Sequence, residues 1–259
     1  MKDELQLIQY PEKSDEKYTL DFMSLENAKQ DQAFHASFPV YKETPLAVLR
    51  ETAGLLGIDN IYVKDESYRF GLNAFKVLGG SYAIGNYLAQ KLGKTLSEMP
   101  YERLVSEEVR KELGDITFVT ATDGNHGRGV AWTAGRLRQR AVVYMPKGSA
   151  AERLENIRAE GAEASITDLN YDGAVRLANR QAQEKGWVMV QDTAWEGYED
   201  IPQWIMQGYG TMGYEAYTQL PEKPTHIFLQ AGVGSMAGAV AGFFAGVYGK
   251  DRPIITIVE

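Results

Sequence analysis

Apolar, β-branched runs alternate with segments of helical periodicity along most of this chain. Such alternation is typical of parallel sheets covered by helices, because a crossover between parallel strands is long enough to hold a helix. The predicted strands are Asn60–Lys64, Ile116–Ala121, Ala141–Met145, Ala164–Thr167, Trp187–Gln191, Thr225–Gln230 and Ile254–Val258. The predicted helices are Ala74–Leu92, Gly127–Leu137, Ala151–Glu160, Tyr171–Lys185, Ile201–Gln219 and Met236–Tyr248. The predicted fold class is therefore α/β.

Two glycine-rich turns indicate how the predicted sheets are arranged. Residues 120–129 and 231–238 each follow a predicted strand and open a helix. Ligands of open α/β sheets bind beyond the carboxyl ends of the strands, so two such turns favour two small lobes that face a common cleft. Residues 1–40 are polar and irregular and are expected to form an arm or a surface layer. Residues 100–113 are expected to form a charged surface helix.

The composition argues against several classes of protein. The net charge is −8 and no run of lysine and arginine is present, so no nucleic-acid partner is expected. No stretch approaches the roughly eighteen apolar residues of a membrane-spanning helix. The first residues, MKDELQLIQYPEKSDEKY, lack the apolar core of a signal peptide. The sequence therefore predicts a cytoplasmic protein without a membrane partner.

The absence of cysteine and the scarcity of histidine limit the available chemistry. A chain without cysteine forms no disulfide, iron–sulfur cluster, thiolate zinc site or cysteine nucleophile. The three histidines, His35, His126 and His226, lie far apart in the sequence, so no local metal-binding motif is present and no metal is predicted. Catalysis would then rely on carboxylates, lysine, hydroxyls, backbone amides or a bound organic cofactor.

The stretch GLNAFKVLGGSYA, residues 71–83, places Lys76 between a loop and a helix. Apolar residues flank the lysine, and the glycine pair that follows leaves room for a ligand to approach. Burial in an apolar pocket disfavours the ammonium form of a lysine and makes its amine nucleophilic toward carbonyls. The ordinary alternative is a solvated helix lysine, and this stretch alone does not decide between them.

The turn at residues 231–238, AGVGSMAG, is a candidate phosphate site. Glycines let backbone N–H groups approach an anion, and the start of the following helix adds partial positive charge. The structural alternative is that the turn binds no ligand and only packs the following helix against the preceding strand. A dinucleotide fingerprint is a further alternative, because Gly232-x-Gly234-x-x-Ala237 fits its relaxed form and Glu259 ends the next strand where a ribose-binding acid would lie.

Two carboxylates also follow predicted strands. Asp123 lies in the turn 120–129, whose glycines could hold a carboxylate and whose Asn125 offers both a donor and an acceptor. Asp123 would repel an anion there unless it acts separately as an acid or base. Asp192 follows the strand WVMVQ and is expected to point into the crevice. For both residues the structural alternative is a helix N-cap, and for His126 it is packing or capping.

Four segments, at residues 71–83, 120–129, 192–197 and 231–238, have now been singled out. Taken together, in their order along the chain, they resemble the fold-type II pyridoxal-phosphate enzymes, the group that includes the serine/threonine dehydratases, cysteine synthase and threonine synthase. The resemblance extends over nearly the whole chain. It implies two open, mostly parallel twisted sheets with the cofactor in the cleft between two lobes. It also implies a larger cofactor-binding domain at residues 1–84 and 194–259, and a smaller α/β domain at residues 85–193 inserted between them.

The resemblance implies a role for each motif. Lys76, in Asn73-Ala74-Phe75-Lys76, would hold pyridoxal 5'-phosphate, and Asn125 would face the phenolic oxygen of its ring. The cofactor phosphate would be bound by Gly232, Val233, Gly234 and Ser235. The substrate would be bound by Thr122, Gly124, Asn125 and His126.

The finer match is to the diaminopropionate ammonia-lyases within that group. It rests on residues 64–76, 122–132, 144–150 and 191–198, and on Asp123 at a position where the dehydratases have serine. This match implies α,β-elimination of D- or L-2,3-diaminopropionate to pyruvate and two ammonia. Lys76 would take the α-proton of the L substrate, Asp123 that of the D substrate, and Asp192 would hold the second, cationic amine. The resemblance also implies a homodimer, the usual oligomeric state of the family.

Chains of this family continue well beyond the strand Ile254–Val258, so the chain is expected to be C-terminally truncated, without the residue that faces the pyridine nitrogen. Three alternatives are kept beside the lyase. They are a related serine/threonine dehydratase-type lyase, an NAD-dependent oxidoreductase built on residues 232–237 and Glu259, and a catalytically inactive fragment of the lyase.

Overall fold

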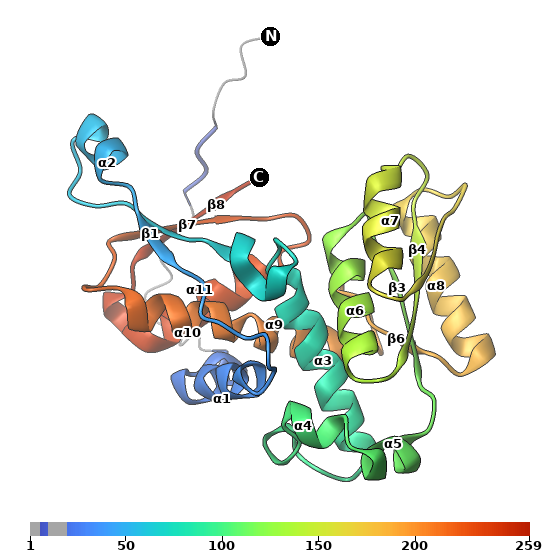
Figure 1. Cartoon of the computed structure of the whole chain (residues 1–259). Helices are drawn as coiled ribbons and strands as arrows, with labels where there is room; N and C mark the ends of the chain where they lie inside the picture. Colours follow the sequence, from blue (N-terminus) through green and yellow to red (C-terminus); the bar gives the residue numbers. More distant parts are fainter. Residues whose placement is uncertain (1–5, 10–19) are drawn as a thin grey trace.

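The computed structural model describes residues 6–9 and 20–259 and contains three separate sheets (Figure 1). The strands are β1 (Leu46–Val48), β2 (Tyr62–Lys64), β3 (Thr117–Ala121), β4 (Arg140–Met145), β5 (Glu163–Ile166), β6 (Val188–Met189), β7 (His226–Gln230) and β8 (Ile254–Val258). The helices are α1 (Leu25–Ala36), α2 (Arg50–Leu56), α3 (Lys76–Lys91), α4 (Tyr101–Leu104), α5 (Glu107–Leu113), α6 (Asn125–Arg136), α7 (Ala151–Ala159), α8 (Tyr171–Lys185), α9 (Asp200–Gly208), α10 (Gly210–Gln219) and α11 (Ser235–Tyr248). Each of the seven predicted strands is present.

The central sheet is parallel, with strand order β5-β4-β3-β6. Strand β3 reads TFVTA and is buried throughout, as expected of an inner parallel strand covered on both faces. Phe118 packs in the main core with α3 and α6, whereas Val119 and Ala121 pack against the alanines of α8. Helices therefore cover both faces of this sheet (Figure 1), which leaves the carboxyl ends of its strands for a site.

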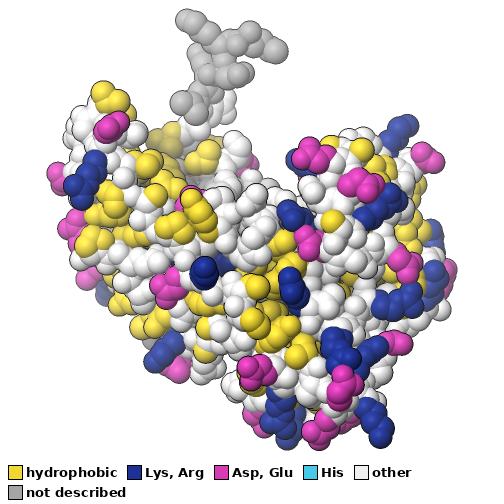
Figure 2. Space-filling view, in the orientation of Figure 1, with side chains coloured by type: hydrophobic (Ala, Val, Ile, Leu, Met, Phe, Trp, Pro, Cys, Tyr) yellow, Lys and Arg dark blue, Asp and Glu magenta, His cyan; other side chains and the backbone are white. Residues whose placement is uncertain are grey.

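The other lobe contains the parallel pair β7–β8 and the antiparallel pair β1–β2, with α1, α9, α10 and α11. Helix α3 connects the lobes and packs closely on α6, since a Cβ atom at Gly129 would lie 2.8 Å from the Cα of Val77. The central sheet lies within residues 85–193, but α3 runs across the predicted boundary without a break. The domain boundaries stay a prediction. On the face shown in Figure 2, acidic and basic side chains are interspersed.

The expectation of an irregular arm at residues 1–40 is wrong for residues 25–36, which form α1. Ser24 caps this helix by accepting a hydrogen bond from the backbone N–H of Asn27 at 3.2 Å. The helix was not predicted because two of its buried residues, Asp31 and His35, are polar and hide the apolar periodicity. Residues 1–5 and 10–19 of the predicted arm lie outside the described residues.

The predicted helix at 201–219 is likewise two helices, α9 and α10, which meet at the buried Tyr209. Helix α9 passes very close to α3 just before this junction. A Cβ atom at Gly208 would lie 2.3 Å from the carbonyl oxygen of Leu78, so only glycine permits this approach. The close packing of α9 on α3 holds the lobe that contains α11 next to the start of α3.

A buried cluster of charges fixes the segment that leads into α3. Arg69 forms a bidentate pair with Glu215 on α10, with both N–O distances at 2.8 Å, and also binds Glu66. The ammonium of Lys64 lies 2.7 Å from the same Glu215 carboxylate. Burial alone would raise the pKa of Glu215, but Arg69 and Lys64 lower it to about 2. The carboxylate therefore stays ionised and ties η2 (Glu66–Gly71) to α10.

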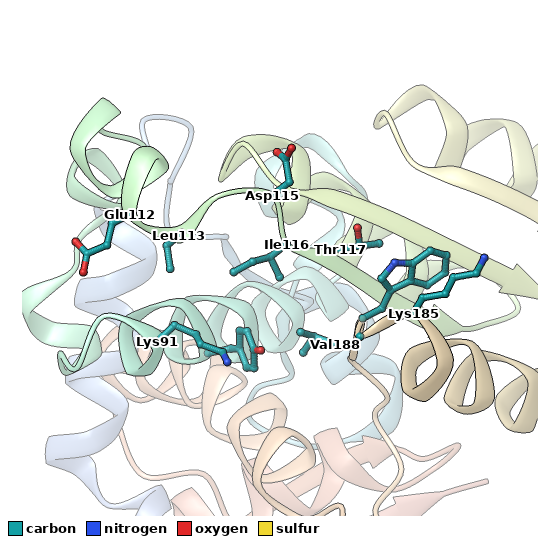
Figure 3. A pocket seen from close by; sticks show the side chains of 11 residues that line it. Lys91, Glu112, Leu113, Asp115, Ile116, Thr117, Lys185 and Val188 are labelled. Atoms are coloured by element: carbon teal, nitrogen blue, oxygen red, sulfur yellow. The ribbon is translucent and has the colours of Figure 1, made fainter.

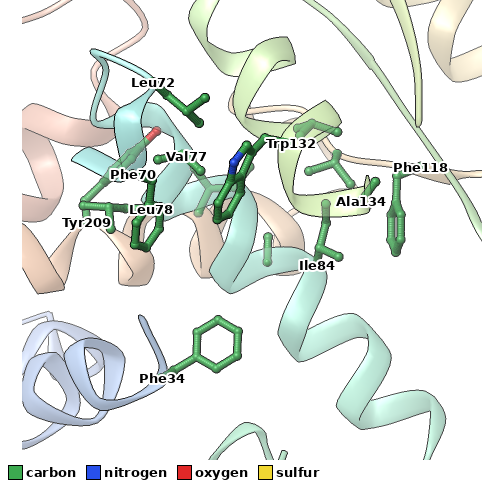
Figure 4. Packing of buried hydrophobic residues seen from close by; sticks show 14 of the residues in the cluster. Phe34, Phe70, Leu72, Val77, Leu78, Ile84, Phe118, Trp132, Ala134 and Tyr209 are labelled. Carbon is green, nitrogen blue, oxygen red and sulfur yellow. The ribbon is translucent and has the colours of Figure 1, made fainter. Parts of the chain in front are cut away.

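Aromatic packing holds the same segment from its other side (Figure 4). Phe70 has a positive φ of 49° and stacks on Trp132 of α6, with ring centroids 5.0 Å apart. Asn73 also has a positive φ, of 55°. Left-handed conformations at non-glycine residues persist only where their surroundings enforce them. The backbone just before Lys76 is thus fixed by packing as well as by charge.

A buried carboxyl on α1 makes the stability of the fold depend on pH. Asp31 is fully buried, and neither of its oxygens has a hydrogen-bond partner in the described part of the chain. Burial raises the pKa of Asp31 well above its usual range, although the nearby Tyr82 hydroxyl opposes this. The folded protein therefore keeps this proton to a higher pH than the unfolded chain does. Stability is lost as the pH rises from the unfolded-state pKa of about 3.9 toward the folded-state pKa.

We expect Asp31→Asn to melt at a higher temperature than the wild type at pH 8, by a margin that shrinks as the pH falls toward 5. The margin should grow by up to about 1.4 kcal/mol for each pH unit between the unfolded-state and folded-state pKa of Asp31, because only the wild type must keep or lose that proton. Thermal melts at both pH values measure it, with the exposed Asp59→Asn as control. An equal margin at the two pH values would contradict this explanation.

Candidate active site

A cavity of about 230 Å³ opens where the two lobes meet, at the carboxyl ends of β3 and β6. Its walls come from the first residue of α3, the loop between β3 and α6, the first residue of α8, the segment after β6, and the turn before α11. The lining residues are Lys76, Ala121, Thr122, Asp123, His126, Tyr171, Asp192, Gly232 and Val233. All four segments singled out in the sequence analysis therefore contribute residues to this cavity, with the other three around Lys76.

Lys76 and Asp192 form the central ion pair of this cavity. The Nζ atom of Lys76 lies 2.7 Å from Oδ2 of Asp192, and the side chains are 30% and 4% exposed. Burial alone would raise the pKa of Asp192, but the charge and hydrogen bond of the Lys76 ammonium oppose this and hold the pKa below its usual range. Asp192 is therefore an ionised carboxylate. The amine of Lys76 meets a charged neighbour, whereas the sequence predicted an apolar one.

His126 is a buried histidine beside this pair, and it donates a hydrogen bond from Nε2 to the backbone. Its side chain is 2% exposed, and Nε2 lies 2.8 Å from the carbonyl oxygen of Val190. Because a carbonyl can only accept, Nε2 carries the hydrogen and Nδ1 is left with a lone pair. Burial lowers the pKa of His126, and the Lys76 cation lowers it further against the pull of Asp192. The neutral Nδ1 lies 4.0 Å from Asp192 Oδ2 and has no hydrogen-bond partner among the described residues.

Asp123 lies at the mouth of the cavity. Its side chain is 75% exposed and lies 3.7 Å from the guanidinium of Arg153, which also donates to its backbone carbonyl at 3.0 Å. Thr122 is buried, and its hydroxyl accepts from the backbone N–H of Gly124 at 3.0 Å, which shapes the turn. Gly124 does not line the cavity. Neither does Asn125, which is exposed at the start of α6.

The turn before α11 forms an open wall of the cavity. Gly232 and Val233 line it, and no atom lies within 4 Å of the positions that Cβ atoms would take at Gly232 and Gly234. Gly234 has a φ of +90°, which favours glycine. Ser235, the first residue of α11, donates its hydroxyl hydrogen to the backbone carbonyl of Asp192 at 2.7 Å. The start of a helix is thus tied to the ion pair, with space for an anion at its free N–H groups.

Two residues of the site had no assigned role in the sequence analysis. The side-chain oxygen of Gln191 accepts from the hydroxyl of Thr120 at 3.0 Å and from the backbone N–H of Ala121 at 3.1 Å. Its amide nitrogen donates to the hydroxyl of Tyr171 at 2.9 Å. Gln191 therefore holds β3, α8 and the Asp192 loop together. The position of a glutamine before an aspartate was visible in the sequence, but its three partners were not.

Tyr171 brings a phenol into the cavity from the first turn of α8. Burial raises its pKa to about 12, and the carboxylates of Asp192 and Asp123 add to the effect. The hydroxyl is therefore protonated at neutral pH and can donate a hydrogen bond into the cavity. Within residues 6–9 and 20–259, no three His, Asp or Glu side chains come together as a metal ion would require. In the same ranges, no helix has both the length and the apolar character needed to cross a bilayer.

A family comparison agrees with this geometry. The profile described as "Pyridoxal-phosphate dependent enzyme" matches residues 38–259. The chain belongs to this family. The match includes the lysine, both glycine-rich turns and Asp192, and it gives no support to the NAD-dependent oxidoreductase considered from the turn at residues 231–238.

Individual relatives narrow the similarity. The chain is 58% identical to the diaminopropionate ammonia-lyase of Salmonella typhimurium over 231 residues, which is 88% of this chain and 57% of that protein. It is 51% identical to the enzyme of Escherichia coli K12 over 245 residues, 93% of this chain and 60% of that one. The chain therefore spans about three fifths of the length of the curated relatives that it matches.

Solved structures confirm the fold class. The apo crystal structure of the Escherichia coli diaminopropionate ammonia-lyase matches with a TM-score of 0.89 and 50% identity, over 93% of this chain and 66% of that one. The processed threonine deaminase isoform 2 of Solanum lycopersicum matches with a TM-score of 0.68 and 23% identity, over 90% and 59% of the two chains, which shows the fold alone. The predicted α/β, fold-type II architecture is thus confirmed.

Proposed function

We propose that this chain holds pyridoxal 5'-phosphate on Lys76 and acts as a lyase that eliminates ammonia from 2,3-diaminopropionate, giving pyruvate and two ammonia. The observation that carries the proposal is the pair of Lys76 and Asp192 in a cavity whose other wall is the open turn at Gly232. The similarity to diaminopropionate ammonia-lyases over 88–93% of the chain supports the same reaction.

The residues at this cavity fit the cofactor. Lys76 provides an amine at the cavity wall, and the space beside Gly232 and Gly234 leaves the N–H groups before α11 open to a phosphate. Lys76 would hold the cofactor covalently, and the amides of residues 232–235 would hold its phosphate. When bound, pyridoxal phosphate supplies an electron sink for the electron pair left on the substrate α-carbon. The role of Asn125 at the ring stays a prediction from the family motif.

Asp192 and His126 favour a substrate with a second amine. Asp192 is buried and ionised, and its cationic partner in this structure is Lys76. Once the amine of Lys76 is engaged by the cofactor, the carboxylate needs another cation, because an unpaired buried charge is strongly unfavourable. A substrate ammonium meets that need, and Nδ1 of His126 can accept a hydrogen bond from it. The hydroxyl of serine would leave the carboxylate unneutralised.

Proton removal from the α-carbon is assigned to two residues. Lys76 would take the α-proton of the L substrate on its amine nitrogen. Asp123 would take that of the D substrate, because its carboxylate reaches the cavity from the loop between β3 and α6. As the family motif implies, Thr122, Gly124, Asn125 and His126 would bind the substrate, the first three at its carboxylate and His126 at its ammonium through the acceptor Nδ1. A homodimer and a cytoplasmic location stay predictions.

Product analysis tests this proposal. The chain is incubated with pyridoxal phosphate and one substrate at a time: D-diaminopropionate, L-diaminopropionate, L-serine or L-threonine. Pyruvate, 2-oxobutyrate and ammonia are then measured in each incubation. We expect two ammonia per pyruvate from diaminopropionate and far slower release from the hydroxy amino acids. Faster turnover of serine or threonine would instead support the dehydratase-type alternative. Bound cofactor without any product would support the inactive fragment.

A further inference from the structure

Two buried hydrogen-bond acceptors lie next to each other in the wall of the cavity around Lys76. Nδ1 of His126 and Oδ2 of Asp192 are 4.0 Å apart, and the two side chains are 2% and 4% exposed. They cannot hydrogen-bond to each other, because Nε2 holds the ring hydrogen for the carbonyl of Val190 and the carboxyl of Asp192 is ionised. Each atom therefore needs a donor from elsewhere.

Lys76 satisfies only one of these two acceptors. Its Nζ atom lies 2.7 Å from Oδ2 of Asp192. Nδ1 of His126 has no hydrogen-bond partner in the part of the chain that the structure describes. A buried acceptor without a donor is unfavourable. The pair is therefore suited to a ligand that carries more than one donor hydrogen.

The spacing of the two acceptors fits a single ammonium group. A nitrogen at the usual distance of about 2.9 Å from each would see them roughly 90° apart, which two N–H bonds of one ammonium can serve with slight bending. A water molecule can also donate twice, but it leaves the buried charge of Asp192 uncompensated when Lys76 holds the cofactor. A potassium ion would compensate the charge, but it donates no hydrogen bond to Nδ1.

The larger cavity at the amino-terminal ends of β3 and β6, of about 390 Å³, offers a contrast (Figure 3). The two carboxylates that line it, Glu112 and Asp115, are both exposed, and Asp115 is paired with Arg110. Its lysines, Lys91 and Lys185, lie against aromatic rings. Water and salt screen exposed charges, so these carboxylates have no strong need of a bound cation.

We propose that Asp192 and His126 form a binding site for free ammonium and for small primary alkylammonium ions. A consequence for catalysis rests on the proposed function. The bond between the β-carbon and its nitrogen breaks with the electron pair on nitrogen, so a bound –NH₃⁺ group leaves as NH₃, which takes a proton from water to become NH₄⁺. This product ion can remain at Asp192 and exclude the second amine of the next substrate.

Thermal melts of Lys76→Ala without cofactor test the site. The variant leaves Asp192 without its cation, and a ligand that binds only the folded protein raises the melting temperature as its concentration rises. We expect ammonium and methylammonium chloride to stabilise Lys76→Ala in a saturable way. Their affinity should be at least about tenfold higher than that of potassium or tetramethylammonium chloride at equal ionic strength, because only the former donate hydrogen bonds.

A second variant and a second readout keep this test decisive. Lys76→Ala/Asp192→Asn lacks the buried charge and should lose the preference for ammonium over potassium. Should Lys76→Ala be unfolded without a ligand, the same four salts are compared for their ability to restore its circular dichroism. Equal effects of ammonium and potassium in either measurement, or an unchanged preference in the double variant, would overturn the proposal.

Nuclear magnetic resonance of Lys76→Ala labelled with ¹⁵N-histidine tests the contact with His126. The protein has three histidines, and single substitutions of His35 and His226 assign the other two signals. Methylammonium should shift Nδ1 of His126 in the direction of a nitrogen that accepts a hydrogen bond. Nε2, which donates to Val190, should stay in place. A Nδ1 signal that methylammonium does not move would exclude His126 from the site.

The catalytic consequence has a measurement of its own. With pyridoxal phosphate bound, ammonium chloride should raise the KM for diaminopropionate severalfold and leave kcat unchanged, whereas potassium chloride at the same ionic strength should change neither. Equal inhibition by the two salts would refute retention of the product ion. The melts and spectra use neither cofactor nor substrate, so failure of the lyase assay would leave the ammonium site untouched, and failure of ammonium binding would leave the lyase function untouched.

Discussion

Replacing Lys76 with alanine is expected to abolish covalent attachment of the cofactor and to reduce diaminopropionate turnover by at least about 10³-fold. Lys76 carries the amine that lines the cavity, and it is also the proposed base for the L substrate. Loss of a positioned acid–base group alone typically costs about 10²–10⁴-fold. The absorbance of protein-bound cofactor after desalting and the rate of pyruvate formation measure the two effects.

The same substitution removes the cation from Asp192, so stability must be measured beside activity. Asp192 is 4% exposed, and its lowered pKa depends in part on Lys76. In the wild type this ionised carboxylate contributes stability above its unfolded-state pKa, and the contribution is lost as the pH falls through the lower folded-state pKa. We expect Lys76→Ala to melt earlier at neutral pH yet remain folded. Lys147→Ala, an exposed lysine outside the cavity, is the matched control. Full cofactor retention by Lys76→Ala would contradict the assignment.

Replacing Asp123 with asparagine is expected to reduce turnover of D-diaminopropionate about 10²-fold more than turnover of the L enantiomer. Asparagine keeps the size of the side chain but cannot accept a proton, and general base catalysis contributes roughly this much. The L substrate would still be deprotonated by Lys76. The ratio of kcat/KM values for the two enantiomers is the measurement, because an effect on binding shared by both cancels in that ratio.

Arg153→Gln is the matched control for this prediction. It removes the cation 3.7 Å from Asp123 and leaves the carboxylate in place, so turnover of the D substrate should persist. Equal losses with both enantiomers in Asp123→Asn would refute the assignment of separate bases. A loss confined to the L enantiomer would reverse it.

Much of the framework could be predicted from the sequence, because the local patterns are strong. The apolar runs that became β3 and β4 pack on helices at both faces, so their composition indicates their structure directly. The two glycine-rich turns follow strands of two different sheets, so no single sheet edge brings them together. The resemblance to the pyridoxal-phosphate enzymes is what predicted that Lys76, Asp192 and Gly232 share a site before their distances were known.

The contacts between segments could not be predicted, since they depend on pairs of residues far apart in the chain. Glu215 binds Arg69 across 146 positions, and each alone resembles a surface charge. The polar surroundings of Lys76 were missed for the same reason, because Asp192 lies 116 positions away. The orientation of Asn125, at the surface of α6 rather than in the cavity, depends on how its helix begins and not on its position in a motif.

The central claim is that Lys76 holds the cofactor, and peptide mapping after borohydride reduction tests it most directly. The protein is saturated with pyridoxal phosphate, reduced so that the bond between cofactor and lysine becomes permanent, digested, and analysed by mass spectrometry. We expect the cofactor mass on Lys76, in near-stoichiometric amount, with only traces on exposed lysines such as Lys147. A dominant label on any other lysine, or no label on Lys76, would contradict the account.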